Sequence, residues 1–467
     1  MSLENKNYWS LVALLALSAC GGGGGGSTTT PVGPQPPVVV VPAPPVTPTP
    51  PVVTANYSFP AGLNYGNGIL PSTHTREQMN QDLTTMWQAW RTAYLENDDT
   101  DPTLKRVMSE NGTTSLSEGI GYGMLISAYM ANTTNTGKDD FDAIFRFYKK
   151  YEKVVGSLNY GVMAWRIGKA GNVIDNFSAP DGDLDAAYAL LVADKKWGSA
   201  GAIDYKAEAV YFINNLMKWS VLNRSTNASQ LIARSDFTLT TQEGSATYSM
   251  SSYQMVGYFN QFRQATGDVR WDATLKAGYK AYDYFYNANP ATGLTPFTFL
   301  TQPGSNQYLK ASRGYNFGFD ACRTPWRVGV DFLWHGNANS QLTHASDSTV
   351  NATLARDMPH RNTQWLKTVS GDNPMNVYSS YELNGTLSSG AYRGSQRNMV
   401  SPMVVAAMVD ASNQDWLNTL YGWMRQQTPG VSYSNGGLTA NTSYYEDTVM
   451  MVNMLIVTGN MPNLPEQ

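Results

Sequence analysis

Residues 114–124 read TSLSEGIGYGM, and no other stretch says more about the fold of this chain. Ser117 is a preferred residue for the start of a helix, and the residues after it are mostly apolar, so a helix is expected from here. Glu118 then lies in its first turn, where the helix dipole alone would favour an acidic side chain. The glycines that follow let a bulky group approach closely. Glu118 is therefore a candidate for acid–base chemistry.

Helical spacing of apolar residues continues through most of the chain after residue 56. The pattern predicts twelve helices, at 75–95, 117–131, 138–152, 183–195, 204–220, 251–265, 270–287, 320–335, 351–369, 397–410, 413–427 and 443–457. Few segments alternate with period two, so the fold class is expected to be all-α. Twelve helices joined by turns and loops indicate an (α/α)6 barrel, with six inner helices inside six outer ones.

The order of the predicted helices brings their acidic residues together. In an up-and-down chain every second helix begins at the same end of the barrel. Glu118 opens the second predicted helix, Asp181 and Asp183 open the fourth, Tyr253 the sixth and Asp320 the eighth. All four helices are even-numbered, so we expect these side chains to meet. Paired carboxylates on a rigid frame are what the hydrolysis of a glycosidic bond requires.

Composition narrows the ligand class. The 467 residues carry a net charge of −4, and nothing in the sequence is basic enough to attract nucleic acid. Aromatic residues make up 12% of the chain, which suits a neutral sugar whose C–H faces stack on aromatic rings. The four histidines show no metal-ligand spacing, and no cofactor is expected. The acidic loop at 98–101 could bind Ca²⁺, but a solvated loop is the simpler interpretation.

The first 56 residues differ from the rest and indicate export. The apolar run Leu11–Leu17 is too short to span a bilayer, and it ends at LSAC, residues 17–20, which resembles a bacterial lipobox. We expect a signal peptide at 1–19, lipid on Cys20, a Gly- and Pro-rich linker at 20–56, and one catalytic domain at 57–467. The chain would then be an outer membrane lipoprotein held by its lipid anchor alone; ordinary secretion is the alternative.

Three stretches resemble the motifs of glycoside hydrolase family 8. They are SEGIGYGM at 117–124, APDGDLDAAYALL at 179–191 and FDACRTPWR at 319–327, in this order along the domain. The resemblance implies an inverting enzyme on an (α/α)6 barrel that cuts β-1,4-linked polysaccharide internally. The second motif favours an endoglucanase acting on cellulose or mixed-linkage β-glucan. An endo-xylanase or a chitosanase is the alternative within the family.

The resemblance also implies a role for each matching carboxylate. Glu118 would be the general acid, which must hold a proton near neutral pH, so its pKa must be raised. A second carboxylate nearby is the expected cause. Asp320 would be the general base that activates water, and Arg323, three residues further on, would keep it ionised. Asp181 would grip the sugar at the cleavage point.

Five further residues are expected to contact the substrate. Trp165 resembles a sugar-stacking tryptophan of the family, and Tyr253 resembles a tyrosine near the hydrolytic water. Asp183 is the alternative to Asp181, although either could simply cap its helix. Tyr122 and Arg323 complete the set.

One residue inside the third motif differs from the family, and one pair of tyrosines lies beyond the three motifs. The chain departs from the family at Phe319, where tyrosine is common, so a hydroxyl group that would help to place the water is absent. Tyr444 and Tyr445 open the twelfth predicted helix and could extend the cleft.

A different class of protein is also considered. An inactive relative that only holds glycan, as a surface lipoprotein, would be expected to lack Glu118 or Asp320. Both residues are present, which favours an enzyme.

Overall fold

The computed structural model describes residues 57–109, 112–153, 161–222, 230–233, 242–243, 246–301, 308–312, 314–393, 396–434, 437–439 and 443–467. All described residues belong to one compact unit, Pro48–Gln467. The expected signal peptide, Cys20 and the linker lie outside the described residues. Within these ranges, every helix is too short or too polar to cross a membrane.

The described residues form thirteen α-helices. They are α1 (Arg76–Tyr94), α2 (Ser117–Met130), α3 (Gly137–Lys150), α4 (Pro180–Trp197), α5 (Tyr205–Trp219), α6 (Val256–Thr266), α7 (Arg270–Ala288), α8 (Thr324–His335), α9 (Ala338–Ser346), α10 (Leu354–Ser370), α11 (Arg397–Ala407), α12 (Gln414–Met424) and α13 (Tyr444–Val457). Twelve match predicted segments. The exception is α9, whose buried face consists of Asn339, Ser340 and Thr343 and therefore shows no apolar period.

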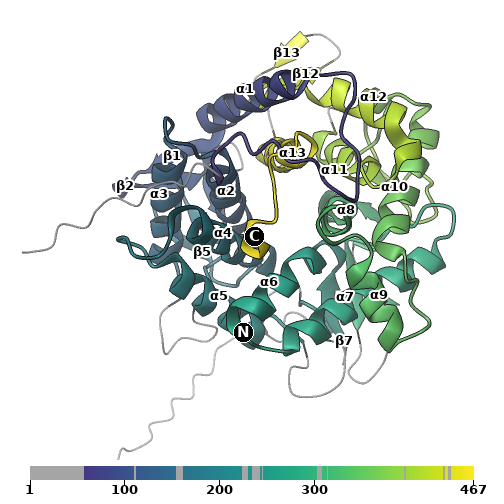
Figure 1. The fold of residues 1–467 in the computed structure, drawn as a ribbon, viewed down its shortest axis with the longest axis horizontal. Helices are drawn as coiled ribbons and strands as arrows, with labels where there is room; N and C mark the ends of the chain where they lie inside the picture. The colour runs from purple at the N-terminus through teal and green to yellow at the C-terminus, as the bar shows by residue number, and fades with distance from the viewer. Residues whose placement is uncertain are drawn as a thin grey trace, which may run out of the picture. The chain divides into compact units, whose positions relative to one another are not determined.

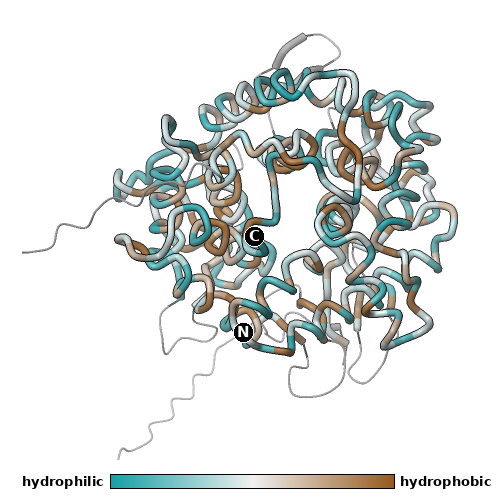
Figure 2. The backbone as a smooth tube through the Cα atoms, in the orientation of Figure 1, coloured by the Kyte–Doolittle hydropathy of each residue, from teal (hydrophilic) through white to brown (hydrophobic). Residues whose placement is uncertain are grey.

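The helices form two rings (Figure 1). The inner ring consists of α2, α4, α6, α8, α11 and α13, and the outer ring of α1, α3, α5, α7, α10 and α12. Every residue of α2 and of α11 is buried, whereas α1 buries one stripe, as expected of a helix with one face in water. Figure 2 shows the same contrast, because the outer helices alternate between hydrophilic and hydrophobic residues. This is the predicted (α/α)6 barrel, with α9 as an addition between α8 and α10.

Short antiparallel strands lie in the connections between helices. The sequence analysis did not predict them. The sheets are β1 (Leu95–Asp98) with β2 (Asp101–Val107); β3 (Thr114–Leu116), β4 (Arg166–Gly168) and β5 (Val173–Asp175); β6 (Gln242–Glu243), β7 (Ala246–Met250), β8 (Thr298–Thr301) and β9 (Tyr308–Lys310); β10 (Phe317–Gly318) with β11 (Ser380–Tyr381); and β12 (Ser432–Ser434) with β13 (Gly437–Thr439). Strands of two to seven residues are too short for alternation to be recognised. Strand β3 leads directly into α2, and β10 leads into the turn before α8.

Two helix starts differ from the prediction. Tyr253 lies in a 3-10 turn, η4 (Ser251–Tyr253), and Asp320 lies in another, η5 (Phe319–Arg323), before α6 and α8 begin. Pro325, in the first turn of α8, fits a helix that begins late, because proline lacks the N–H that this turn leaves unpaired. Three more 3-10 turns are η6 (Pro374–Asn376), η7 (Ala411–Asn413) and η8 (Leu464–Glu466).

Helices α2 and α4 contact each other closely at two glycines, Gly121 and Gly182. A Cβ atom added to Gly121 would lie 2.5 Å from the carbonyl oxygen of Gly182. A Cβ atom added to Gly182 would lie 2.6 Å from the backbone nitrogen of Glu118 and would overlap the carbonyl group of Ser117. The starts of α2 and α4 therefore approach each other more closely than any larger residue allows, which brings Glu118 and Asp181 together.

We expect Gly182→Ala to lower the free energy of unfolding by roughly 1–3 kcal/mol, because its methyl group would overlap backbone atoms that cannot turn aside. Gly422, inside α12, is the matched control, since an added Cβ there meets nothing within 4 Å. Gly422→Ala should raise stability by roughly 0.5–1 kcal/mol. Urea unfolding measures both. Equal effects of the two substitutions would contradict the tight α2–α4 contact.

Candidate active site

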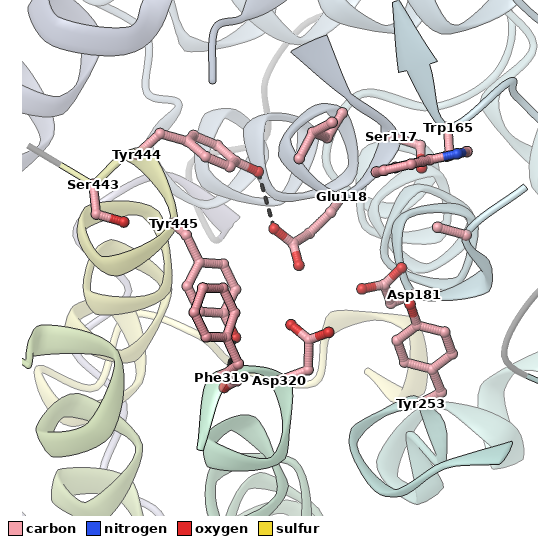
Figure 3. Close-up of a pocket in the computed structure, with 12 residues that line it drawn as sticks. Ser117, Glu118, Trp165, Asp181, Tyr253, Phe319, Asp320, Ser443, Tyr444 and Tyr445 are labelled. Atoms are coloured by element: carbon pink, nitrogen blue, oxygen red, sulfur yellow. Dashed lines mark hydrogen bonds between the residues drawn. The ribbon is translucent and has the colours of Figure 1, made fainter. Parts of the chain in front are cut away.

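A cavity of about 470 Å³ opens at one end of the barrel. Its lining comes from the starts of α2, α4 and α13, from the turns η4 and η5, and from the residue before β4: Leu116, Ser117, Glu118, Trp165, Ala179, Asp181, Tyr253, Phe319, Asp320, Ser443, Tyr444 and Tyr445. The sequence predicted that Glu118, Asp181, Tyr253 and Asp320 would lie close together, because each was expected at the start of an even-numbered helix. Figure 3 shows the three carboxylates facing the centre of the cavity.

One buried guanidinium group joins the three carboxylates. Arg323 is fully buried, and its Nη1 lies 2.6 Å from Oε2 of Glu118 and 2.7 Å from Oδ2 of Asp181. Its Nη2 lies 3.1 Å from Oδ1 of Asp320. Nη1 also donates to the Tyr122 hydroxyl group at 3.1 Å. The expected contact between Arg323 and Asp320 is present, but the guanidinium group of Arg323 also forms ion pairs with Glu118 and Asp181.

The surroundings of Glu118 favour the protonated form of its carboxyl group, which a proton donor needs. Burial raises the pKa of Glu118 to about 8, against the opposing charge of Arg323 and with a further contribution from the negative charges of Asp181 and Asp320. Its Oε1 accepts a hydrogen bond from the Tyr444 hydroxyl group at 3.1 Å, which lowers the pKa. The expectation that a neighbouring carboxylate is the main cause is corrected here, because burial is the largest one.

The other two carboxylates differ in their exposure. The Asp181 side chain is 3% exposed, and its Oδ1 accepts the backbone N–H of Gly182 at 2.9 Å. The Asp320 side chain is 20% exposed. Water therefore reaches Asp320 more readily than Asp181.

Trp165 and Tyr253 line the cavity, as expected of residues that contact a sugar. The carbonyl group of Trp165 accepts the backbone N–H of Ser117 at 2.8 Å, which fixes the tryptophan beside the start of α2. Tyr253 places its ring 5.7 Å from the Arg323 guanidinium group.

Three expected sugar contacts lie behind the cavity wall: Asp183, Tyr122 and Arg323 are buried and do not line it. Asp183 accepts hydrogen bonds from the Tyr148 hydroxyl group and from the backbone N–H of Met163, the latter at 3.4 Å. Burial raises the pKa of Asp183 to about 7. Because Met163 is two residues before Trp165, Asp183 supports the segment that carries Trp165.

Sequence reasoning left the role of Tyr444 open and assigned none to the Phe319 ring. Tyr444 holds Glu118, and its position at an even-numbered predicted helix start was the signal that could have shown this. Phe319 lines the cavity beside Asp320. Its ring stacks on the ring of Tyr445, with centroids 5.7 Å apart, a contact for which the sequence offers no signal.

Two acidic side chains of the loop at 98–101 pair with groups outside the loop. The Asp98 carboxylate lies 2.5 Å from Nζ of Lys150 and 3.4 Å from Nη1 of Arg106. Oδ1 of Asp101 accepts the backbone N–H of Thr103 at 3.0 Å. Across the described part of the chain, no group of three or more His, Cys, Asp or Glu side chains has an arrangement that could hold a metal ion.

We expect Arg323→Leu to lower the free energy of unfolding by roughly 3–5 kcal/mol at neutral pH, because it leaves buried carboxylates without a counter-charge. Without the charge of the arginine the pKa of Glu118 rises further above its value in the unfolded chain, so stability should recover as the pH falls. Arg425→Leu is the control, since Arg425 pairs with Asp82 in a partly exposed position worth about 0–1 kcal/mol. Urea unfolding at acidic and neutral pH measures the stability of both variants. A loss of stability in Arg323→Leu that does not change with pH would contradict this explanation.

Comparison with known proteins identifies the family of this chain. The family model Glycosyl hydrolases family 8 matches residues 70–421. A beta-glucanase of Niallia circulans is 31% identical over 87% of this chain and 91% of its own. An endoglucanase of Bacillus sp. (strain KSM-330) is 27% identical over 86% of this chain and 81% of its own.

A solved structure extends the agreement to the fold. The apo structure of a beta-1,3-1,4-glucanase from Paenibacillus sp. X4 superposes with a TM-score of 0.74 at 29% identity, covering 87% of this chain and 99% of that one. The family match spans most of the barrel and includes all three carboxylates. This chain belongs to glycosyl hydrolases family 8 and is a glycoside hydrolase built on an (α/α)6 barrel.

Proposed function

We propose that this protein is an inverting endo-β-1,4-glucanase that cuts cellulose or mixed-linkage β-glucan. The observation that carries the proposal is the set of three carboxylates around one cavity, with a proton held on Glu118 at neutral pH. The relatives named above are glucanases, which supports glucan as the substrate class. Aromatic rings at the cavity wall suit a neutral sugar chain.

Glu118 gives its proton to the oxygen that bridges two sugar units. A general acid works best when its pKa lies near the working pH, and burial brings Glu118 into that range. Once the proton has left, the new negative charge rests against Arg323 at 2.6 Å and accepts the Tyr444 hydroxyl group at 3.1 Å. Both contacts stabilise the charged form and so favour the transfer.

Asp320 takes a proton from the attacking water. It is the most exposed of the three carboxylates, and contact with Arg323 favours the ionised form that a base needs. Figure 3 shows Asp320 and Glu118 facing each other across the cavity. Inverting enzymes leave room for a water molecule between the sugar and the base, with carboxyl groups roughly 6.5–9.5 Å apart.

Asp181 holds the sugar at the cleavage point. Arg323 and the backbone N–H of Gly182 fix its carboxylate, so the group is oriented before substrate arrives. A fixed acceptor at this position favours one orientation of the sugar hydroxyl groups, and pre-organisation of this kind lowers the barrier to reaction.

The substrate test compares β-glucan, xylan and chitosan, with new reducing ends as the measurement. We expect release from glucan to exceed release from the other two. Faster release from xylan or chitosan would assign the chain to the alternative substrates of its family. No release from any of them would favour a protein that only binds glycan.

We also propose that Cys20 carries lipid and anchors the enzyme in the outer membrane, with ordinary secretion as the alternative. The lipobox-like sequence supports this, and the linker at 20–56 would hold the domain away from the membrane. Cell fractionation tests the anchor: the protein should sediment with membranes, and Cys20→Ala should abolish this. A wild-type protein found only in the medium would refute the anchor.

We expect Glu118→Gln to fold normally and to lower kcat on β-glucan by about 10²–10⁴-fold, because the amide cannot donate the proton that the leaving oxygen needs. Glu96→Gln is the control, since Glu96 is an exposed carboxylate whose contact is a surface ion pair with Lys169. Reducing-end release measures both variants. Near-normal turnover by Glu118→Gln would remove Glu118 from the mechanism.

We expect kcat/KM to fall as the pH rises through about 8, because Glu118 then loses the proton that it must donate. Tyr444→Phe removes a hydrogen bond that favours the charged form of Glu118, so the fall should move to higher pH. The pH dependence of kcat/KM on soluble β-glucan measures both. A shift of the Tyr444→Phe profile to lower pH would contradict the role of this contact.

A further inference from the structure

A second cavity, of about 430 Å³, lies on the outer wall of the barrel, and none of its lining residues belongs to the catalytic cavity. Its walls come from α7, from β9 and from the residues between α9 and α10. Figure 1 shows α7 and α9 side by side in the outer part of the barrel. A concave site of this size can hold a small ligand or part of a polymer.

One polar group in this cavity lacks a partner. Tyr308 lines the cavity and is only 6% exposed, yet no described residue forms a hydrogen bond with its hydroxyl group. The hydroxyl oxygen is not among the unpaired side-chain atoms that are sealed from solvent, so it is reached from the cavity. Because buried polar groups nearly always have a hydrogen-bond partner, this unpaired hydroxyl group indicates a place for a ligand.

An exposed aromatic ring lies beside Tyr308. Tyr284 is 41% exposed, and its ring packs against the rings of Phe285 and Tyr308, with centroids 5.2 and 5.1 Å apart. Phe285 and Tyr308 belong to a buried cluster that joins α7 to strands β8 and β9. The Tyr284 ring is therefore supported on one side and open on the other, which suits stacking on the C–H face of a sugar.

Charged and amide side chains complete the rim of the cavity. Lys280 lies 3.1 Å from Asp347. Asp283 accepts hydrogen bonds from the side-chain amide of Asn287 at 2.8 Å and from the backbone N–H of Asn351 at 2.9 Å. These side chains have further donors and lone pairs, so they can bond to hydroxyl groups in either sense. One lysine beside two aspartates disfavours an anion, and the described residues contain no cluster that could hold a metal ion. A neutral polyhydroxyl ligand fits best.

The second cavity lies toward the catalytic end of the barrel. Tyr284 and Asn287 lie in the last two turns of α7. After α7 the chain reaches η5, which carries Asp320, before α8 begins. Because consecutive helices run in opposite directions, the end of α7 and the start of α8 lie at the same end of the barrel. A polysaccharide much longer than the catalytic cavity can thus contact both cavities.

We propose that this second cavity is a non-catalytic glucan-binding site, in which Tyr284 stacks on a sugar ring and the Tyr308 hydroxyl group bonds to the same sugar. The inference rests on the proposed function, since it takes the substrate to be glucan. Two points of attachment on one polymer raise the effective concentration of the chain at the second point. The site therefore holds substrate near the catalytic cavity and takes no part in the cut itself.

Titration calorimetry with cellotetraose counts the binding sites, in the Glu118→Gln background so that the sugar is not cut. We expect two classes of site, one in each cavity. Tyr284→Ala should weaken the second class roughly tenfold, because it removes the ring face that the sugar would bury. Tyr308→Phe should weaken it roughly three- to tenfold, because it removes only the hydroxyl group. Val269→Ala is the matched control, because Val269 is exposed at the opposite end of α7 and lines neither cavity.

Rates on two substrates give a second measurement that a merely structural effect would not move. With Glu118 intact, Tyr284→Ala should lower kcat/KM on polymeric β-glucan roughly three- to tenfold more than on cellotetraose, because the polymer is long enough to occupy both cavities at once. A loss of folding would slow both substrates alike, and an unchanged ratio of the two rates would contradict the role of the second cavity.

The outcomes separate this inference from the proposed function. A single class of site in the Glu118→Gln protein, or a second class that Tyr284→Ala leaves intact, would overturn the inference even if the wild-type enzyme cuts glucan. A wild-type enzyme that cuts no glucan would overturn the proposed function instead, whereas a second class of site that is lost with Tyr284 would still support the binding site.

Discussion

The site depends on a single buried positive charge shared by three negative side chains. Burying a guanidinium group is costly unless it is paired, and Arg323 meets this cost through Glu118, Asp181 and Asp320. One positive charge cannot balance three carboxylates, so the cluster favours at least one proton. That proton rests on Glu118, whose pKa burial raises to about 8. The difference between Glu118 as the acid and Asp320 as the base thus follows from the number of charges in the cluster and from how deeply each carboxyl group is buried.

A second buried ion pair lies one helical turn beyond Arg323. Arg327, in α8, contacts both carboxylate oxygens of Asp185 on α4, at 2.8 and 2.6 Å. The two arginines are four residues apart and so project from the same face of the chain. Helix α4 therefore presents Asp181 and Asp185 to a matching pair of arginines. The close approach of α2 through Gly121 and Gly182 then adds Glu118 to the same cluster.

Much of this site could be predicted from the sequence, because helix order decides which residues meet. Glu118, Asp181, Tyr253 and Asp320 open even-numbered segments, and α9 does not disturb the result because it is a short helix within the connection from α8 to α10. Asp183 does not join them, since residues two apart on a helix do not face each other. The geometry of α4 thus places Asp181, the carboxylate that the sequence analysis preferred, in the cavity wall and its alternative Asp183 behind that wall.

Other features need three-dimensional information in principle. The depth of burial that raises the pKa of Glu118 depends on neighbours from several helices. The positive φ of Phe319 occurs where its carbonyl group accepts a hydrogen bond from Tyr445, more than a hundred residues later. Helix α9 packs through polar side chains, so its sequence lacks the apolar period by which helices are recognised.

The central claim is that Glu118 and Asp320 act from opposite sides of the sugar, one on the leaving oxygen and one on water. The most direct test is proton NMR of the first product formed from a β-linked glucan, before mutarotation mixes the anomers. Attack by water on the face opposite the leaving group predicts that the α-anomer appears first. Initial release of the β-anomer would show retention and would contradict the roles assigned to both carboxylates.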